Sequence, residues 1–306
     1  MDPRLVYRSQ DVVAAYKDAD YLEAPERYLL NALEPALSRM SMLDIAVGAG
    51  RTSRYFAARV GRYVGIDFSD EMIRLCTERF GSDLPNATFM VADMRDLGCL
   101  QNERFDLVLI SFNGISVLAH EERLKVFRAI RNLCQPGAYF LFSAHNLHCV
   151  PKLFGVLGLL AQLSLRRPKQ SYSLLREWLL RRFVYCRVLS YKHWLSNGHQ
   201  VLNDGAHGGR LLHYYVTPAE QVAQLTGTFE DVRVLRRNGE EFHVDGAAEP
   251  ADDYWLFYLC RAAAVSSPAT KESAATPVIA DTRSARRASH GVAQPPVVAA
   301  HALPHT

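Results

Sequence analysis

Two glycines at the end of an apolar run are the residues best suited to bind a ligand through the backbone. Gly48 and Gly50 follow the run Leu43–Val47 and precede Arg51–Arg59, which has the composition of a helix. Because glycine lacks a side chain, the backbone can turn tightly here and approach a ligand closely. The helix that follows would present free N–H groups and the positive end of its dipole. The spacing therefore predicts a pocket for a nucleotide-like ligand.

Acidic residues end the next two apolar runs. Asp67 closes the run Tyr63–Asp67, and Asp93 closes the run Phe89–Asp93. A carboxylate at the tip of a second strand suits a contact with two ribose hydroxyls. Dinucleotide-binding enzymes share that feature, but their G-x-G-x-x-G pattern is broken here because Ser53 stands at the third glycine. Asp93, at the end of the third run, is therefore needed to distinguish a dinucleotide from another nucleotide-like ligand.

Together these residues resemble the first motifs of the class I S-adenosylmethionine-dependent methyltransferases. The resemblance implies that the glycine turn meets the methionine part of S-adenosylmethionine, that Asp67 holds the ribose, and that Asp93 with Met94 holds the adenine. The run Phe105–Val108 resembles the family's strand beneath the reaction centre. The likeness covers residues 42–144 and resumes over 217–262.

The resemblance also implies the cofactor, S-adenosylmethionine, and the residues that bind it. These are Asp44, Ala46, Gly48, Gly50, Asp67, Phe68, Asp93, Met94 and Ser111. Asp44 is expected to reach the cofactor's amino group through water. Ala46 departs from the family, which usually has glycine there. Since alanine favours negative φ, we expect a turn that differs slightly from the family's or that needs no positive φ at this position.

Candidate catalytic residues follow the fourth and fifth predicted strands and end a long insertion. Asn113 is either a residue that orients the acceptor or holds the methionine end of the cofactor, or a turn residue before Gly114. Histidine side chains in general titrate near neutrality, so His145 suits a base for a hydroxyl or ammonium group, with a hydrogen bond to a loop backbone as the alternative. Tyr214 is the third candidate, and a packed aromatic strand is its alternative.

The neighbours of Tyr214 carry further expectations. On a strand, His213 and Tyr215 would face one side and Tyr214 the other. His199 and His207 lie in a polar, glycine-bearing loop, so we expect both to be solvated. No spacing among the eleven histidines indicates a metal site.

Alternating strand and helix patterns predict the α/β scaffold that holds these residues, with a parallel sheet. The resemblance makes it a Rossmann-like, seven-stranded methyltransferase sheet, mostly parallel with an antiparallel last strand. The strands are expected near 42–47, 63–67, 87–92, 105–111, 138–144, 229–236 and 254–261. Ser69 is expected to cap a helix over 70–80, and Thr217 with Glu220 forms a capping box that has Pro218 at the first helical position.

The chain divides into a cap, a core with an insertion, and a tail. Residues 1–41 read as an N-terminal helical cap, from which Tyr16 or Tyr21 contacts the cofactor or simply packs between helices. Residues 42–262 form the methyltransferase domain, and 145–216 are a substrate lid inserted after strand five. Residues 263–306, rich in Ala, Ser, Thr and Pro, are expected to be a disordered tail.

Basic and aromatic residues interleave over 166–192, behind the apolar run 153–165. The apolar run 153–165 is interpreted as a buried lid helix or an interfacial helix. The basic stretch 166–192 is interpreted as a solvated cationic helix face, or as part of a contact of 152–192 with a membrane surface or an acidic substrate. RNA binding is a further alternative. A net charge of only +3 gives nucleic acid little support.

Composition bounds the class of protein. The 306 residues are 49% hydrophobic, enough for a packed core, and the six cysteines show no C-x-x-C spacing. The chain lacks an apolar signal core and a run long enough to span a bilayer, so we expect a cytoplasmic protein with reduced thiols.

The functional hypothesis is methyl transfer from S-adenosylmethionine to a small-molecule acceptor, at oxygen or nitrogen. A non-catalytic binding or scaffold protein of the same fold is one alternative, and an RNA methyltransferase that uses the basic lid is another. The residues name neither the acceptor nor the oligomeric state.

Overall fold

The strands of the chain form one mixed sheet. The computed structural model describes residues 3–17, 19–154, 168–180, 191–244 and 253–263. The strands in these ranges are β1 (Ser41–Ile45), β2 (Arg62–Asp67), β3 (Ala87–Val91), β4 (Phe105–Ile110), β5 (Cys134–Asn146), β6 (His199–Leu202), β7 (His213–Val216), β8 (Glu230–Leu235), β9 (Glu241–Phe242) and β10 (Trp255–Arg261). The seven strands expected from the sequence correspond to β1–β5, β8 and β10.

The strand order is β3-β2-β1-β4-β5-β10-β8-β9. The five strands from β3 to β5 are parallel neighbours, whereas β10 lies antiparallel between β5 and β8. This mixed, mostly parallel topology confirms the predicted fold class. The carboxyl ends of β1, β2, β4 and β5 therefore meet at one edge, which is where ligands bind in open α/β sheets.

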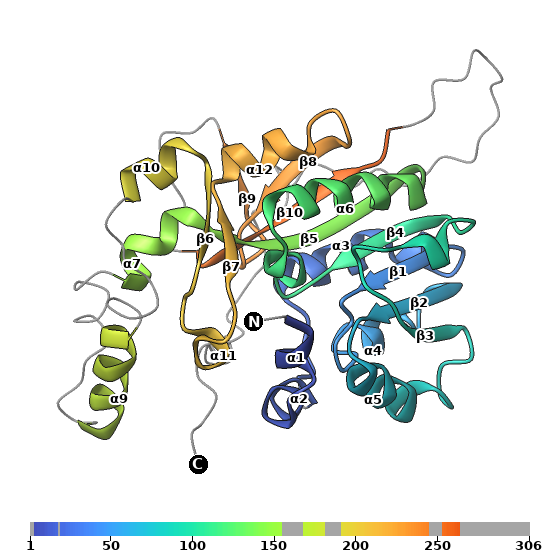
Figure 1. Cartoon of the computed structure of the whole chain (residues 1–306). Coiled ribbons are helices and arrows are strands. Elements are labelled where there is room, and N and C mark those ends of the chain that lie inside the picture. The colour runs from blue at the N-terminus through green and yellow to red at the C-terminus, as the bar shows by residue number, and fades with distance from the viewer. Residues whose placement is uncertain (1–2, 18, 155–167, 181–190, 245–252, 264–306) are drawn as a thin grey trace, which may run out of the picture.

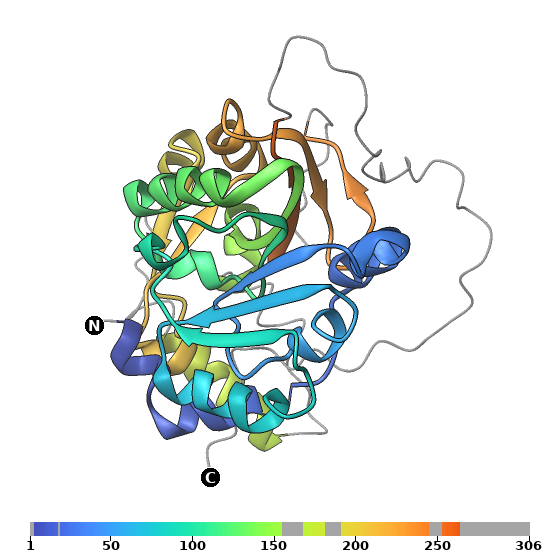
Figure 2. The ribbon, with the colours of Figure 1, turned by 90° about the vertical axis from the view of Figure 1, so that its right-hand side faces the viewer.

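Helices cover both faces of the sheet (Figure 2). The α-helices of the described ranges are α1 (Pro3–Tyr7), α2 (Gln10–Lys17), α3 (Ala24–Leu37), α4 (Ser53–Phe56), α5 (Asp70–Phe80), α6 (His120–Leu133), α7 (Val150–Phe154), α9 (Pro168–Leu179), α10 (Tyr191–Ser196), α11 (Ala206–Gly209) and α12 (Pro218–Leu225). One hydrophobic core joins α3 and α4 to the sheet, and a second joins α6 and α12 to its opposite face. Such two-sided burial explains the near-continuous apolar runs of the central strands.

The helix ends follow the predicted capping residues. The Ser69 hydroxyl accepts a hydrogen bond from the Met72 N–H at the start of α5, and the Thr217 hydroxyl accepts one from the Glu220 N–H at the start of α12. Pro218 occupies the first turn of α12. Pro35 lies inside α3, which ends shortly after it at Leu37 because proline supplies no N–H to the helix.

The insertion between β5 and α12 adds strands to the sheet. β6 and β7 pair antiparallel, and β7 runs parallel to the end of β5, with His145 opposite Tyr215. This β6–β7 hairpin therefore extends the carboxyl edge of the sheet (Figure 1). The division of the chain into cap, core, lid and tail remains a proposal built on this arrangement.

Several expectations fall wholly or partly outside the described residues. The apolar run 153–165 is described only to Phe154, the basic stretch 166–192 only over 168–180 and 191–192, and the tail 263–306 only at Ala263. α9 exposes Tyr172, Leu175 and Leu179. Among the described ranges, no helix combines the length and apolar character that crossing a bilayer requires.

The N-terminal helices α1 and α2 lie between the β6–β7 hairpin and α5 (Figure 1). The Tyr7 ring centroid is 5.3 Å from that of His207 and 5.7 Å from that of Phe68. His207 is buried beneath Tyr7 and Tyr16, so the expectation of a solvated loop histidine is wrong. Its polar neighbours in sequence suggested exposure, but the covering rings come from the other end of the chain.

Candidate active site

The glycine turn connects β1 to α4. Gly48 has φ +56° and Gly50 has φ +83°, both in the left-handed region that favours glycine. A Cβ at Gly50 would lie 2.5 Å from a Phe80 ring carbon, whereas a Cβ at Gly48 would meet no atom within 4 Å. Gly50 is therefore needed for packing, and the Gly48 backbone is bare enough for a ligand to approach.

Ala46 adopts φ +56°, so the alternative in which the turn needs no positive φ at this position is wrong. The cause is tertiary: the Val47 N–H donates to the Ile66 carbonyl at 3.0 Å, and the Gly48 N–H donates to Asp67 Oδ2 at 3.0 Å. These bonds tie the turn to β2. They outweigh the left-handed penalty of an L-residue, which is about 1–2 kcal/mol.

Ala46→Gly is expected to raise the free energy of unfolding by about 0.5–1 kcal/mol, because glycine adopts this φ without strain. The greater entropy of glycine in the unfolded chain offsets part of the gain. Denaturant unfolding followed by circular dichroism measures the change. The matched control is Ala129→Gly inside α6, which should lose about 1 kcal/mol. A less stable Ala46→Gly protein would contradict a strained turn.

Asp67 ends β2 with its carboxylate held by two backbone amides. Its Oδ2 atom accepts from the Gly48 N–H at 3.0 Å, and its Oδ1 atom accepts from the Ser69 N–H at 2.9 Å. Burial raises the pKa of Asp67 to about 6, an effect that these hydrogen bonds partly oppose. Each carboxylate oxygen has a second lone pair, so the group can still accept from two hydroxyls.

Asp44 lies buried beneath the turn. Its Oδ2 atom accepts hydrogen bonds from the Thr52 hydroxyl at 2.5 Å and the Tyr63 hydroxyl at 2.6 Å. Burial raises the pKa of Asp44 to about 6, against the effect of these two donors. The residue thus stabilises the turn from below.

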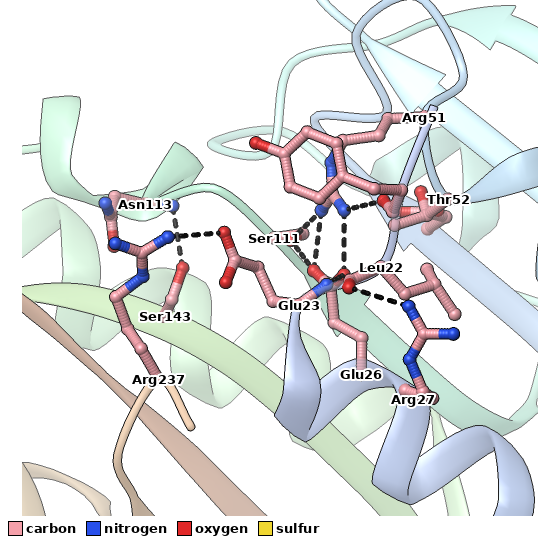
Figure 3. Close-up of polar contacts among 12 residues, drawn as sticks. Leu22, Glu23, Glu26, Arg27, Arg51, Thr52, Ser111, Asn113, Ser143 and Arg237 are labelled. Atoms are coloured by element: carbon pink, nitrogen blue, oxygen red, sulfur yellow. Dashed lines mark hydrogen bonds and ion pairs between the residues drawn. The ribbon is translucent and has the colours of Figure 1, made fainter. Parts of the chain in front are cut away.

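A buried ion pair beside the turn was missed in the sequence (Figure 3). Arg51 donates to the two Glu26 carboxylate oxygens at 2.6 and 2.8 Å, and to the Ser111 hydroxyl at 2.6 Å. Glu26 belongs to α3 and Ser111 follows β4, so the pair joins the N-terminal helices to the turn. The position of Arg51 directly after Gly50 was the available signal, but nothing in the sequence pointed to Glu26 as its partner.

A first cavity, called the turn cavity here, lies at the carboxyl ends of β1 and β2. Predicted cofactor residues form much of its wall: Asp44, Ala46, Gly48, Asp67, Phe68 and Ser111. Tyr7, Tyr16, Arg51 and Phe112 also line it. Tyr16, one of the two tyrosines expected to contact a cofactor from the N-terminal segment, therefore reaches this cavity.

Asp93 and Met94 line an adjoining cavity, the Asp93 cavity, which shares Phe68 and Val117 with the turn cavity. The Asp93 carboxylate forms an ion pair with Arg95 at 2.6 Å. The structure thus places the two predicted acids, Asp67 and Asp93, in neighbouring cavities.

The histidine cavity adjoins the turn cavity through Tyr7, Tyr16 and Phe112, which line both. Its other walls are Asn113, His145, Ala206, His207, His213 and Trp255. Two of the three candidate catalytic residues, Asn113 and His145, therefore lie at one cavity.

The backbone of Asn113 lies in a turn, and its side-chain oxygen is available to accept a hydrogen bond from a ligand. Its φ is +59°, and Phe112 before it has φ +51°. Its N–H donates to the Ser143 hydroxyl at 2.8 Å (Figure 3), whereas its buried Oδ1 atom has no hydrogen-bond partner among the described residues. A buried polar atom without a partner costs free energy, and strained backbone often occurs at functional sites. Both features favour a ligand at Asn113.

Tyr214, the third candidate catalytic residue, does not line the histidine cavity with Asn113 and His145. Its hydroxyl lies 2.7 Å from His120 Nδ1 and accepts from Gln224 at 3.0 Å, and it lines the Asp93 cavity. The predicted alternation is confirmed, because His213 and Tyr215 both bind Asp204 Oδ2 at 2.8 Å, away from Tyr214. Periodicity predicted the two faces of the strand but not which one borders the histidine cavity.

Comparison with known proteins agrees with this geometry. The CcbJ methyltransferase from Streptomyces caelestis has a TM-score of 0.54 at 17% identity, covering 85% of this chain and 98% of that one. An S-adenosylmethionine-dependent methyltransferase from Clostridium acetobutylicum ATCC 824 has a TM-score of 0.53 at 14% identity, covering 83% and 95%. These likenesses show the fold. A family model described as a methyltransferase domain matches residues 42–137. Residues 42–137 therefore match a methyltransferase domain, and the fold of the chain is that of S-adenosylmethionine-dependent methyltransferases.

Two curated relatives match this chain over only part of its length and of their own. Phosphoethanolamine N-methyltransferase 1 of Triticum aestivum is 27% identical over 133 residues, which is 43% of this chain and 26% of that protein. The protein YqeM of Bacillus subtilis (strain 168) is 26% identical over 114 residues, which is 37% of this chain and 45% of that protein. The chain thus spans less than half the length of either curated relative.

The turn cavity fits S-adenosylmethionine, the methyl donor of proteins with this fold. The bare Gly48 backbone leaves room for close approach, and the Asp67 carboxylate suits ribose hydroxyls. The aromatic rings of Tyr7, Tyr16 and Phe112 suit a positively charged sulfonium.

Proposed function

We propose that this methyltransferase acts on a small-molecule acceptor, at an oxygen or a nitrogen atom. One observation carries the proposal: the turn cavity and the histidine cavity share Tyr7, Tyr16 and Phe112 as walls. A cofactor and an acceptor bound in the two cavities would meet at these residues. Positioning of that kind contributes about 7–11 kcal/mol to a bimolecular reaction, so the adjacency supports methyl transfer.

The proposed cofactor site uses the residues expected from the sequence. Gly48 and Gly50 shape the turn against the methionine part, and Asp67 accepts hydrogen bonds from the ribose. Asp93 and Met94 hold the adenine in the Asp93 cavity. The other predicted cofactor residues that line the turn cavity are Asp44, Ala46, Phe68 and Ser111. When bound, S-adenosylmethionine supplies an electrophilic methyl group.

The proposed acceptor site is the histidine cavity. Asn113 Oδ1 has no partner in the part of the chain that the structure describes, so it would accept a hydrogen bond from an O–H or N–H group of the acceptor and orient it. His145 lines the same cavity and is the proposed proton acceptor. Tyr214 lies outside this cavity and has no role in the proposal.

Two observations support a small acceptor. The histidine cavity lies beneath the N-terminal helices, since Tyr7 and Tyr16 form part of its wall. Covering helices exclude water and leave little room for a polymer. In addition, one curated relative is named a phosphoethanolamine N-methyltransferase, after a small molecule.

The first test is calorimetric titration of S-adenosylmethionine into the purified chain, with NAD as the control ligand. Saturable binding of S-adenosylmethionine and none of NAD is expected. Labelled methyl transfer to defined phenols, alcohols and amines then identifies the acceptor class. Absence of S-adenosylmethionine binding would overturn the proposal and leave a non-catalytic use of the fold.

A further inference from the structure

Two histidines that line the histidine cavity lie beside a buried carboxylate. His145 lies near the end of β5, His213 begins β7, and Asp204 lies in the loop between β6 and β7. One ligand atom from each lies within 4.8 Å of the other two, and all three residues are buried. A cation about 2.0–2.2 Å from each ligand holds its ligands about 3–4 Å apart, so small side-chain adjustments suffice to bind one ion.

Neighbouring groups already fix the three side chains. The Asp204 carboxylate accepts from His213 Nδ1 and the Tyr215 hydroxyl, each at 2.8 Å, and from the Ala206 N–H at 2.9 Å. The His145 ring stacks on Tyr215, with centroids 4.8 Å apart. The Tyr215 and Ala206 contacts lie outside the ligand set, and outer contacts of this kind are typical of metal sites. The His213–Asp204 hydrogen bond joins two proposed ligands, and a bound ion would replace it.

The charge of the cluster also favours a cation. Asp204 is completely buried, and burial of a carboxylate requires strong compensation. We propose that His145, His213 and Asp204 bind a divalent transition-metal ion. Two imidazoles and one carboxylate suit Zn²⁺, Fe²⁺, Co²⁺ or Mn²⁺, whereas Mg²⁺ and Ca²⁺ prefer ligand sets built from oxygen.

The position of the ion gives it a role that rests on the proposed function. His145 and His213 both line the histidine cavity, together with Asn113. Three protein ligands leave open coordination positions, and these would face the acceptor. A metal ion there would bind an oxygen of the acceptor and lower the pKa of its hydroxyl. With the ion bound, His145 would be a ligand and no longer the proton acceptor, because its basic nitrogen would be occupied. The site therefore favours hydroxyl-bearing acceptors.

A second group of residues provides a matched control. His120, His199 and Glu220 also bring ligand atoms within 4.8 Å of one another, but they are only partly buried. Their two imidazoles are stacked face to face, 4.2 Å apart and 9° from parallel. Nitrogen lone pairs lie in the ring plane, so two parallel rings cannot aim at one ion without turning apart. This group is expected not to bind the metal.

The test is a titration of Co²⁺ into tag-free, chelator-treated full-length protein, followed by visible d–d absorption and by competition with a chelating dye. One equivalent is expected to bind. His145→Ala and His213→Ala should each weaken Co²⁺ binding at least about 100-fold, and Tyr215→Phe about 10-fold. His199→Ala should leave Co²⁺ affinity unchanged.

Absence of a Co²⁺ complex would overturn the metal site, as would equal binding by wild type, His145→Ala and His213→Ala. Loss of binding in His199→Ala alone would place the ion at the other group and would equally overturn it. S-adenosylmethionine calorimetry on each variant shows whether the fold and the turn cavity are intact. If the protein binds Co²⁺ but not S-adenosylmethionine, the metal site stands and the proposed function is overturned. If it binds S-adenosylmethionine but not Co²⁺, the proposed function stands and the metal site is overturned.

Discussion

Asp67→Asn is expected to weaken S-adenosylmethionine binding at least about 100-fold. Each carboxylate oxygen already accepts one backbone N–H, from Gly48 and from Ser69. An asparagine NH₂ group would face one of those N–H groups, so the turn loses a hydrogen bond as well as the anionic acceptor for the ribose. Hydrogen bonds to charged groups contribute about 1.5–3 kcal/mol each, and two of them account for the factor.

Calorimetry on the purified variant measures this loss, and its melting temperature shows whether the fold survives. The control is Asp83→Asn, because Asp83 is exposed after α5 and does not line the turn cavity. Unchanged affinity in Asp67→Asn would remove Asp67 from the cofactor site.

The same carboxylate gives the binding a pH dependence. Burial raises the pKa of Asp67 to about 6, so the group is ionised at pH 7.5 and largely protonated at pH 5. Ribose hydroxyls donate best to the ionised form. S-adenosylmethionine affinity is therefore expected to be constant above pH 7 and to fall as the pH drops through 6.

Titrations at a series of pH values test this dependence, and Asp67→Asn should reduce it. Burial also raises the pKa of Asp44 to about 6, so Asp44→Asn is needed to separate the two carboxyls. A profile that is flat from pH 7.5 to 5 would show that the protonation state of Asp67 does not affect binding.

Local patterns predicted the parts of the fold that depend on neighbours in sequence. Apolar runs marked β1–β5, and Ser69 and Thr217 marked helix starts, because caps and strands are set within a few residues. Asp67 and Gly48 could both be assigned to one cofactor pocket, since each lies at the carboxyl end of a predicted parallel strand. The family resemblance then supplied the antiparallel direction of the last strand.

Ala46 and the histidine cavity show where sequence reasoning fails. The φ of Ala46 is set by hydrogen bonds to β2, which no local preference reports. His213 and Asp204 become neighbours only because the β6–β7 hairpin docks at the end of β5. Alternation along β7 placed His213 and Tyr214 on opposite faces of the strand. Only the position of the hairpin against β5 shows that the face with His213 borders the cavity.

Glu26→Gln is expected to lower the free energy of unfolding by about 3–5 kcal/mol, the usual cost of breaking a buried ion pair from one side. The Glu26 side chain is fully buried, and Arg51 is about nine-tenths buried, with 9% of its side chain exposed. Glu26 also accepts from the Ser111 hydroxyl and from the Glu23 N–H. Glutamine removes the charge that balances the guanidinium and places an NH₂ group among these donors.

The comparison that isolates the pair is a double-mutant cycle with Arg51→Met, measured by denaturant unfolding. If the cost arises from leaving one charge buried alone, the double variant should lose markedly less than the sum of the two single changes. The control is Arg54→Met, which breaks the exposed Arg54–Asp20 ion pair in the same segment and should cost less than about 1 kcal/mol.

Additive losses in that cycle would mean that each residue acts through its own separate contacts. Coupled losses would show that a single ion pair holds α3 against the glycine turn. Because Arg51 also lines the turn cavity, that coupling should appear in S-adenosylmethionine affinity too, with Glu26→Gln weakening binding although Glu26 does not line the cavity. The N-terminal helices would then support the cofactor site through this ion pair as well as through Tyr7 and Tyr16.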